Sequence, residues 1–235
     1  MDVDLLAFGA HPDDVEIGAG GILAAHAAMG YKCAIIDLTA GEMSTNGSVD
    51  ERKAEAREAA DVLKCVSRTC LGLPDAHLDI RKECIYKIAE SIREFRPRIV
   101  LAPYFRNDRH PDHSTAGELV KRASFMSGLK RLPINGEPFR PEKLYFFLLT
   151  VEETPDFVVD ISPVYEIKEE AVKAHRTQFF LHSSRVPTIV NNPSFLHNIR
   201  SRDSYFGSLI GVSWGEGLLL NEKPRVSDLI KWGGA

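Results

Sequence analysis

Apolar and polar positions follow two patterns that alternate along the first half of the chain. Three short apolar runs are typical of buried parallel strands: Leu5–Phe8, Cys33–Leu38 and Ile99–Ala102. Between the first two runs, Glu16–Met29 predicts a helix that ends at Gly30. A further helix is expected to begin at Ser48, because the residues that follow include acids where the helix dipole favours them.

Helical spacing is clearest before the third run, where apolar side chains share one face at Ile85, Ile88, Ala89, Ile92 and Phe95. In the second half, Leu144–Leu149 and Phe157–Ile161 are expected strands, and Pro163–Phe179 is an expected helix. Strands that alternate with helices predict an α/β fold, with a Rossmann-like, mostly parallel sheet and helices on both faces. No repeat or linker interrupts the pattern, so residues 1–235 are expected to form a single domain.

Two similar motifs follow two of the predicted strands. His11-Pro12-Asp13-Asp14 comes after the first strand, and His110-Pro111-Asp112-His113 comes after the strand Ile99–Ala102. Ligands of open parallel sheets bind beyond the carboxyl ends of the strands. We therefore expect the two motifs to lie together in the fold, although they are far apart in the sequence.

The residue types of the two motifs suit zinc. A catalytic zinc site usually has three protein ligands from His and Asp or Glu, and it leaves one position for water. His11 and Asp14 are three residues apart, as are His110 and His113, so each pair can converge in a turn or at a helix start. The motifs offer more groups than three ligands require. This surplus is expected of a hydrolase, which also needs a base and a proton donor.

Composition narrows the class of protein. The 235 residues are 44% hydrophobic and 26% charged, which excludes a disordered or fibrous chain. Lys and Arg total 29 against 33 for Asp and Glu, a balance that argues against a nucleic-acid partner. No apolar run approaches the roughly 18–20 residues that span a bilayer, and the first residues are acidic where a signal peptide is basic. We expect a cytoplasmic protein with no membrane partner.

The chain resembles the LmbE/PIG-L family of zinc-dependent N-acetylglucosaminide deacetylases. The resemblance rests on Ala10–Glu16 with the glycines that follow, and on the second motif at His110–His113. It continues through shorter matches at Gly41-Glu42, Arg52–Ala59, Leu73–Asp75, Ala174–Phe179 and Trp214–Gly217. The resemblance implies one zinc ion per chain, or another divalent metal, a small N-acetylglucosaminide substrate, a homo-oligomer, and a single deacetylase domain over residues 1–235.

The resemblance also implies roles for individual residues. His11, Asp14 and His113 would bind the metal. Asp13 would be the general base that takes a proton from the attacking water. A protonated His110 would help to stabilise the oxyanion, and Asp13 or His110 would protonate the departing amine.

For substrate binding, Arg52 and Asp75 would hold sugar hydroxyls. Arg109 would bind the carboxylates of a malate aglycone, since arginine can grip a carboxylate with two parallel hydrogen bonds.

Within the family, the chain is most similar to the bacillithiol-pathway branch, which removes acetate from N-acetylglucosaminyl-malate. The short length, Thr45-Asn46-Gly47 and Arg185–Thr188 support this branch. Mycothiol-pathway relatives have a tyrosine at the position of Asp108, so a tyrosine-assisted step is in doubt here. The alternatives with the same chemistry are a deacetylase of chitooligosaccharides and an amidase of thiol conjugates.

Two rival functions belong to other classes. An NAD-dependent oxidoreductase needs G-x-G-x-x-G in the turn after the first strand, and that turn holds His11–Asp14 instead. A non-catalytic sugar-binding module with a structural metal would have a closed set of four ligands, often cysteines. Both rivals fit the sequence less well than a hydrolase.

Several of these residues also have plainer interpretations. Asp13 could cap a helix, Arg52 could be a solvated helix residue, and Arg109 could be an exposed loop cation. His110 could be a fourth ligand or could orient one, and Asp112 is expected to orient a histidine. His77 is expected to be a polar turn residue rather than a ligand.

Overall fold

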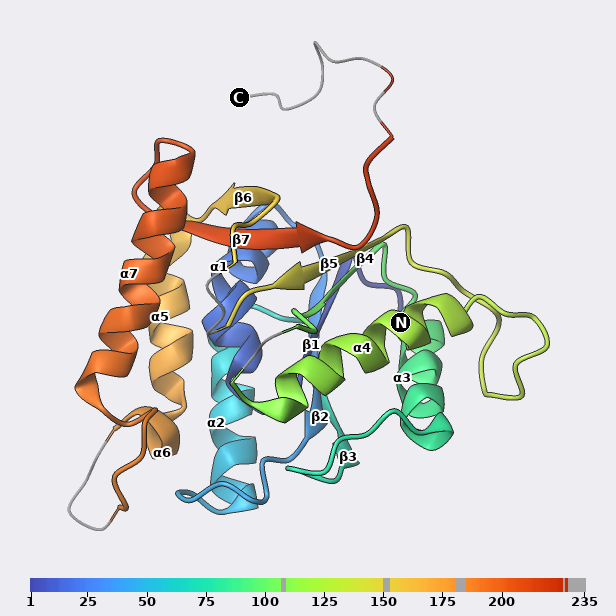
Figure 1. The fold of residues 1–235 in the computed structure, drawn as a ribbon, viewed down its shortest axis with the longest axis horizontal. Helices are drawn as coiled ribbons and strands as arrows, with labels where there is room; N and C mark the ends of the chain where they lie inside the picture. Colours follow the sequence, from blue (N-terminus) through green and yellow to red (C-terminus); the bar gives the residue numbers. More distant parts are fainter. Residues whose placement is uncertain (107–108, 150–152, 181–184, 226, 228–235) are drawn as a thin grey trace.

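A single mixed sheet lies at the centre of the molecule (Figure 1). The structure is a computed structural model, and it describes residues 1–106, 109–149, 153–180, 185–225 and 227. Within these residues the sheet order is β3-β2-β1-β4-β5-β7-β6. The strands are β1 Leu5–Gly9, β2 Cys33–Thr39, β3 Ser67–Leu73, β4 Ile99–Pro103, β5 Lys143–Phe147, β6 Phe157–Asp160 and β7 Gly215–Leu220.

The first five strands are parallel, and β1 lies between β2 and β4. Leu5 is paired with Cys33 on one side and with Ile99 on the other. The segments after β1 and β4 therefore leave the sheet next to each other, at the carboxyl edge. Only β7 is antiparallel to its neighbours β5 and β6 among the described strands.

Helices cover both faces of the sheet (Figure 1). They are α1 Asp14–Ala28, α2 Val49–Val62, α3 Lys82–Phe95, α4 Pro111–Met126, η1 Ser162–Val164, α5 Tyr165–Ala174, α6 Arg176–Phe179 and α7 Pro193–Leu209. One apolar cluster packs α1 and α5 against the sheet, and a second packs α3 and α4 against the other face. The predicted fold class is confirmed.

The expected helix Pro163–Phe179 is divided. The 3-10 turn η1 precedes α5, and the chain bends again at His175, whose φ of −78° and ψ of 62° are not helical. His175 is fully buried at this bend. The bend turns Thr177 and Gln178 away from the axis of α5, which matters for the site below.

The glycines after the first motif serve packing. A Cβ atom on Gly18 would overlap the ring of Phe147, and one on Gly21 would lie 2.7 Å from Ile161. Both glycines are inside α1 rather than in the turn before it. Their arrangement lets the helix approach the sheet closely, and it does not form the phosphate-binding turn of a dinucleotide site.

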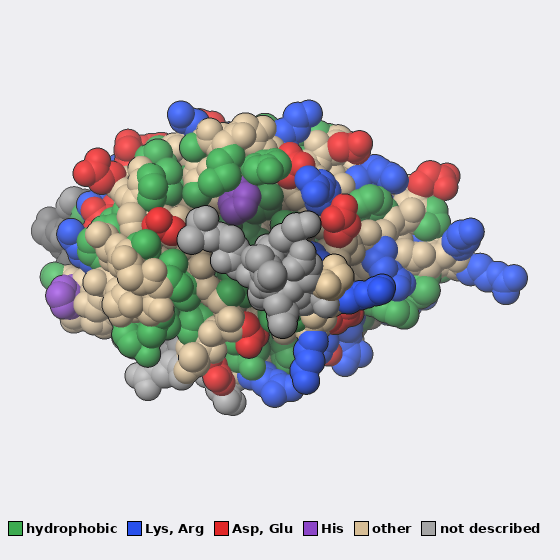
Figure 2. All heavy atoms as spheres, turned by 90° about the horizontal axis from the view of Figure 1, so that it is seen from above, with side chains coloured by type: hydrophobic (Ala, Val, Ile, Leu, Met, Phe, Trp, Pro, Cys, Tyr) green, Lys and Arg blue, Asp and Glu red, His purple; other side chains and the backbone are tan. Residues whose placement is uncertain are grey.

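The surface carries both signs of charge. On the face shown in Figure 2, acidic side chains are scattered among basic ones. Among the described helices, none combines the length and the apolar composition required to cross a bilayer.

Candidate active site

The turn between β1 and α1 is strained at Asp13. Its φ of 124° is a backbone conformation that L-residues rarely adopt. Asp13 occupies the N-cap position of α1, yet its side chain makes no capping hydrogen bond. The helix-capping interpretation of this acid is therefore wrong. The neighbouring Asp14 instead accepts a hydrogen bond from the backbone N–H of His11, at 2.9 Å, which closes the turn.

The second motif forms the start of α4. His110 is its N-cap, and the ring Nδ1 accepts a hydrogen bond from the backbone N–H of Asp112 at 3.3 Å. Pro111 fixes the first helical residue, where a missing N–H has no cost. One turn of backbone brings His113 back toward the first motif, and its Nε2 lies 3.1 Å from Asp14 Oδ1. The two motifs thus meet, as predicted.

Three imidazole rings gather around this contact. The ring centres of His11 and His110 are 4.7 Å apart, those of His11 and His113 are 5.3 Å apart, and those of His110 and His113 are 4.9 Å apart. The ligand atoms of these three histidines lie within 4.8 Å of one another. The same is true of His11, Asp75 and Asp112. His11 is common to both groups.

His11 is enclosed by carboxylates. Its Nδ1 lies 3.6 Å from Asp14 Oδ2, whereas its Nε2 lies 3.0 Å from Asp75 Oδ1 and 3.5 Å from Asp112 Oδ2. Burial of His11 alone would lower its pKa, but the three acids outweigh it and hold the pKa well above the usual value. The site therefore favours a positive charge at this position.

The donor set fits a divalent metal. His11 and Asp14 are buried, and the Nε2 atom of His11 faces the carboxylates of Asp75 and Asp112 rather than solvent. Imidazole nitrogens and carboxylate oxygens are the ligands that zinc takes in catalytic sites. Because carboxylates that contact a ligand histidine often orient it, Asp75 and Asp112 can serve either as ligands or as partners of His11.

Arg52 is buried against the first turn. The guanidinium donates to the backbone oxygens of Pro12, at 2.5 Å, and of Gly41, at 3.3 Å, and it lies 3.4 Å from Asp13 Oδ2. Arg52 is only 3% exposed, so its interpretation as a solvated helix residue is wrong. Arg52 links α2 to the strained turn and faces Asp13, the expected general base.

Burial also changes the pKa of the two candidate proton-transfer groups. The pKa of Asp13 is raised to about 6, chiefly by burial, while Arg52 opposes the rise. The pKa of His110 is lowered by partial burial and by the neighbouring histidines His11 and His113. The lowered pKa favours a neutral His110 ring, whereas the sequence analysis expected a protonated one. Since its Nδ1 accepts a hydrogen bond, Nε2 carries the proton.

These groups line a pocket of about 360 Å³. Pockets that bind small ligands are usually of this size or larger. All eight residues predicted for the site line it: His11, Asp13, Asp14, Arg52, Asp75, Arg109, His110 and His113. Arg109 is exposed at the rim, while Asp75 uses one oxygen to accept from the backbone N–H of Met43 at 2.9 Å. Asp108 lies outside the described residues.

The structure adds two amide side chains that the sequence analysis did not assign to the site. Gln178 donates to the backbone oxygen of Asn46 at 2.8 Å, and both residues line the pocket. Asn46 also exchanges two hydrogen bonds with the backbone of Val186, at 2.8 and 3.0 Å. These bonds join the loop after β2 to the second half of the chain, which closes one side of the pocket. His77 is an exposed turn residue outside the pocket.

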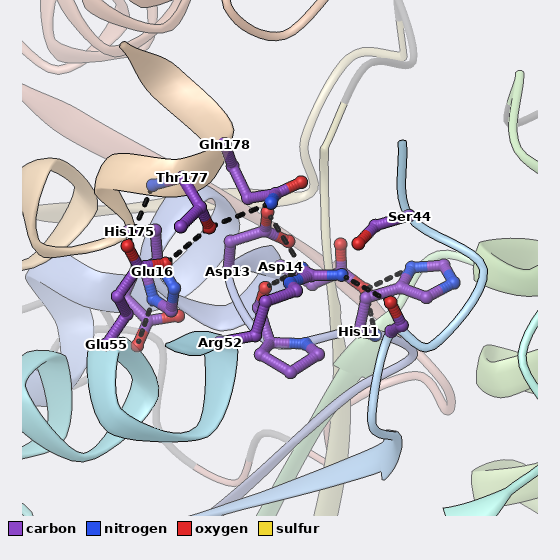
Figure 3. Close-up of polar contacts among 12 residues, drawn as sticks. His11, Asp13, Asp14, Glu16, Ser44, Arg52, Glu55, His175, Thr177 and Gln178 are labelled. Carbon is purple, nitrogen blue, oxygen red and sulfur yellow. Dashed lines mark hydrogen bonds and ion pairs between the residues drawn. The ribbon is translucent and has the colours of Figure 1, made fainter. Parts of the chain in front are cut away.

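A buried ionic network supports the first turn of α1. Arg68 on β3 contacts Glu16 on α1 and donates to both oxygens of Asp37 on β2, each at 2.8 Å. His175 lies 3.4 Å from the same Glu16 carboxylate (Figure 3). The network joins three elements beneath the strained turn, so it fixes where α1 begins.

Comparisons with known proteins agree with this geometry. Residues 6–124 match the family described as PIG-L: GlcNAc-PI de-N-acetylase, a range that includes both motifs. A diacetylchitobiose deacetylase of Thermococcus kodakarensis is 32% identical over 183 residues, which are 72% of this chain and 67% of the relative. A Bacillus subtilis protein named "Probable N-acetyl-alpha-D-glucosaminyl L-malate deacetylase 2" is 28% identical over 72% of this chain and 80% of its own length.

A solved structure is similar over nearly the whole chain. The crystal structure of a conserved protein from Thermus thermophilus superposes with a TM-score of 0.89 and 36% identity. The match covers 99% of this chain and 100% of that protein, so the second half of the fold is shared as well. The chain belongs to the PIG-L/LmbE family of deacetylases.

Proposed function

We propose that this chain removes the N-acetyl group from an N-acetylglucosaminide by metal-dependent hydrolysis, and that residues 1–235 form one deacetylase domain. One observation carries the proposal. The strained, buried Asp13 faces the same pocket as the imidazole and carboxylate donors of two motifs that meet beside it. A base next to a metal site is the arrangement that hydrolysis of an amide requires.

The metal would be held by His11, Asp14 and His113, and zinc is the proposed ion. Held there, a divalent cation supplies Lewis acidity, which lowers the pKa of water and polarises a carbonyl. Asp112 and Asp75 would hold the ring of His11 through its Nε2 atom, which lies 3.5 and 3.0 Å from them. Such contacts orient a ligand and raise its basicity.

Asp13 would take a proton from the water that attacks the amide carbonyl. The backbone strain at Asp13 and the contact with Arg52 keep this carboxylate in place while it acts. His110 would donate its Nε2–H to the oxyanion that forms from the carbonyl oxygen. Asp13 then returns the proton to the nitrogen of the sugar, so that acetate and a free amine leave.

The proposed substrate is N-acetylglucosaminyl-malate. Its support comes from the sequence, from the Bacillus subtilis relative, and from Arg109, which lines the pocket at an exposed position where it can pair with a carboxylate. Arg52 and Asp75 would bind sugar hydroxyls. The second candidate substrate is a chitooligosaccharide, which the similarity to the Thermococcus kodakarensis deacetylase favours.

A substrate panel tests both the deacetylase activity and the choice of N-acetylglucosaminyl-malate as substrate. Acetate release is measured from N-acetylglucosaminyl-malate, diacetylchitobiose and free N-acetylglucosamine, and metal content is measured on the same sample. We expect release from the malate conjugate to be much faster than from free N-acetylglucosamine. Equal rates would refute the malate assignment and leave the deacetylase assignment intact, whereas no release from any of the three would refute both. The homo-oligomer and the cytoplasmic location stay predictions.

A further inference from the structure

One side of the pocket is apolar and has no part in the proposed reaction. It is made by four side chains that we call the apolar wall: Ile17, Leu149, Val190 and Phe195. Ile17 and Leu149 are each 6% exposed and belong to the main apolar cluster, while Val190 and Phe195 are half-buried against it. The wall is thus an extension of the hydrophobic core into the pocket.

Arg202 fixes the segments that carry the wall. Its guanidinium donates to the backbone oxygens of Ile17, at 2.5 Å, and of Leu149, at 2.7 Å. Phe195 and Arg202 are seven residues apart on α7, so they share one face of that helix. The ring of Phe195 also stacks on Phe179, with centres 5.9 Å apart and planes 19° apart. The wall is therefore held in place by hydrogen bonds to its backbone and by stacking of its aromatic ring.

The wall begins beside the reacting groups. The backbone N–H of Ile17 donates to the backbone oxygen of Asp13 at 3.0 Å, so Ile17 lies one helical turn after the proposed base. Ser44 and Asp75, two polar residues of the lining, lie on the β2 and β3 side of β1, because Ser44 follows β2 and Asp75 follows β3. Leu149 follows β5, on the far side of β4. The sheet order therefore places Ser44 and Asp75 on the opposite side of the pocket from Leu149, although Met43 lines the first side and the later segments also bring Thr188 and Gln178.

A substrate of the proposed kind has a polar and an apolar part, with hydroxyls on the sugar and an apolar acyl group on the amide. We propose that the apolar wall receives the acyl group, and that the chain hydrolyses N-acylglucosaminides whose acyl group is longer than acetyl. The inference rests on the proposed function. A methyl group covers only a small part of four large side chains, so an acyl chain with more methylenes gains contacts. Each buried methylene is worth roughly fourfold in affinity.

Hydrolysis of an acyl series tests the inference. The release of free amine is followed for the N-acetyl, N-butanoyl and N-hexanoyl derivatives of glucosamine. We expect kcat/KM for the butanoyl amide to equal or exceed that for the acetyl amide. Phe195→Ala should lower the butanoyl-to-acetyl ratio by roughly tenfold, because the ring no longer covers the added methylenes. Val190→Trp should lower the same ratio by filling the space beside the wall.

Phe125→Ala is the matched control. Phe125 is an exposed aromatic residue on α4 that does not line the pocket, and its loss should leave the ratio unchanged. A binding arm avoids turnover: calorimetry with Asp13→Ala should show N-hexanoylglucosamine binding more tightly than N-acetylglucosamine, by up to roughly 250-fold if all four added methylenes are buried.

Other outcomes overturn the inference. It fails if wild-type protein cleaves the butanoyl amide more than about 100-fold more slowly than the acetyl amide, or if neither wall variant changes the ratio. Octyl N-acetylglucosaminide tests whether the wall contacts an apolar aglycone instead of the acyl group. A gain for this glycoside that Phe195→Ala removes, with no gain in the acyl series, would assign the wall to the aglycone. Cleavage of the acetyl amide alone spares the proposed function, whereas no cleavage of any of these amides or of N-acetylglucosaminyl-malate refutes that function itself.

Discussion

At the scale of single residues, the site depends on two residues in unfavourable surroundings: one has a strained backbone, and both bury a polar side chain. Asp13 is strained and buried, and His11 is buried among three carboxylates. The sequence predicted that these residues meet, because both motifs follow parallel strands and the turns after such strands lie at the same edge of the sheet. Gln178 and Asn46 lie in segments that carry the resemblance, but they were not assigned to the site because their roles depend on hydrogen bonds between the side chain of one segment and the backbone of another. Such bonds leave no pattern in the sequence.

Asp13→Ala tests the role of the strained acid. We expect the variant to retain its metal and to release acetate about 10²–10⁴-fold more slowly, as for the loss of a general base. Acetate release and elemental analysis of the same sample check both parts. Loss of the metal in this variant would show that Asp13 is a ligand and that the proposed roles are wrong.

Asp112→Asn tests the support of His11. The substitution keeps the shape of the side chain but removes the negative charge that lies 3.5 Å from His11 Nε2. We expect metal affinity to fall by roughly 10–100-fold, as for other groups that orient a ligand. Competition with a chelator of known affinity measures the change, and the exposed Asp61→Asn serves as control. Equal affinities in the two variants would contradict the orienting role.

At the scale of elements, the sequence predicted the strands that have apolar side chains on both faces. It missed β3, an edge strand whose residues are half-exposed or exposed except for Leu73, and whose Arg68 points inward to Asp37 and Glu16. It also missed β7, in which Glu216 is 1% exposed and lies 2.7 Å from Lys168 Nζ. Charges that are paired inside the core have the sequence pattern of a loop, so periodicity could not identify these strands.

Two glycines of α1 offer a matched pair of substitutions. Gly18→Ala drives a methyl group into the ring of Phe147, so we expect a loss of about 1–3 kcal/mol in the free energy of unfolding. Gly20→Ala meets no atom nearer than 3.5 Å, so the better helix propensity of alanine should raise that free energy by up to about 1 kcal/mol. Urea denaturation of both variants measures the difference. Equal stabilities would mean that α1 does not pack as closely as described.

At the scale of the whole molecule, the ionic network beneath α1 predicts how stability changes with acid. Burial opposes the charge of Glu16, but Arg68 and His175 outweigh it and lower its pKa from 4.5 to about 2. Between these values the unfolded chain binds more protons than the folded one. The free energy of unfolding should therefore fall as the pH is lowered from about 5 toward 2, and urea midpoints across this range measure it.

Two variants assign this acid dependence to the buried pair. Glu16→Gln should reduce the slope between pH 5 and pH 3, because Glu16 no longer titrates, while Asp14 and Asp75, whose pKa values are also lowered, keep part of it. Glu58→Gln removes an ion pair with Arg176 that is about half exposed on both sides, and solvent screens such pairs. This second variant should keep the slope of the unmodified chain. A slope that disappears in Glu58→Gln and persists in Glu16→Gln would contradict the assignment to Glu16.

The two motifs lie within the first 113 residues, whereas three of the four side chains of the apolar wall come after residue 148. If the wall receives the acyl group as proposed, the choice of amide is set mainly by segments that are separate in sequence from the two motifs. Family members that share one reaction would then diverge mainly downstream of β5. A chimaera that joins residues 1–142 of this chain to the corresponding later part of a relative should adopt the relative's acyl selectivity and keep the glycoside selectivity of this chain.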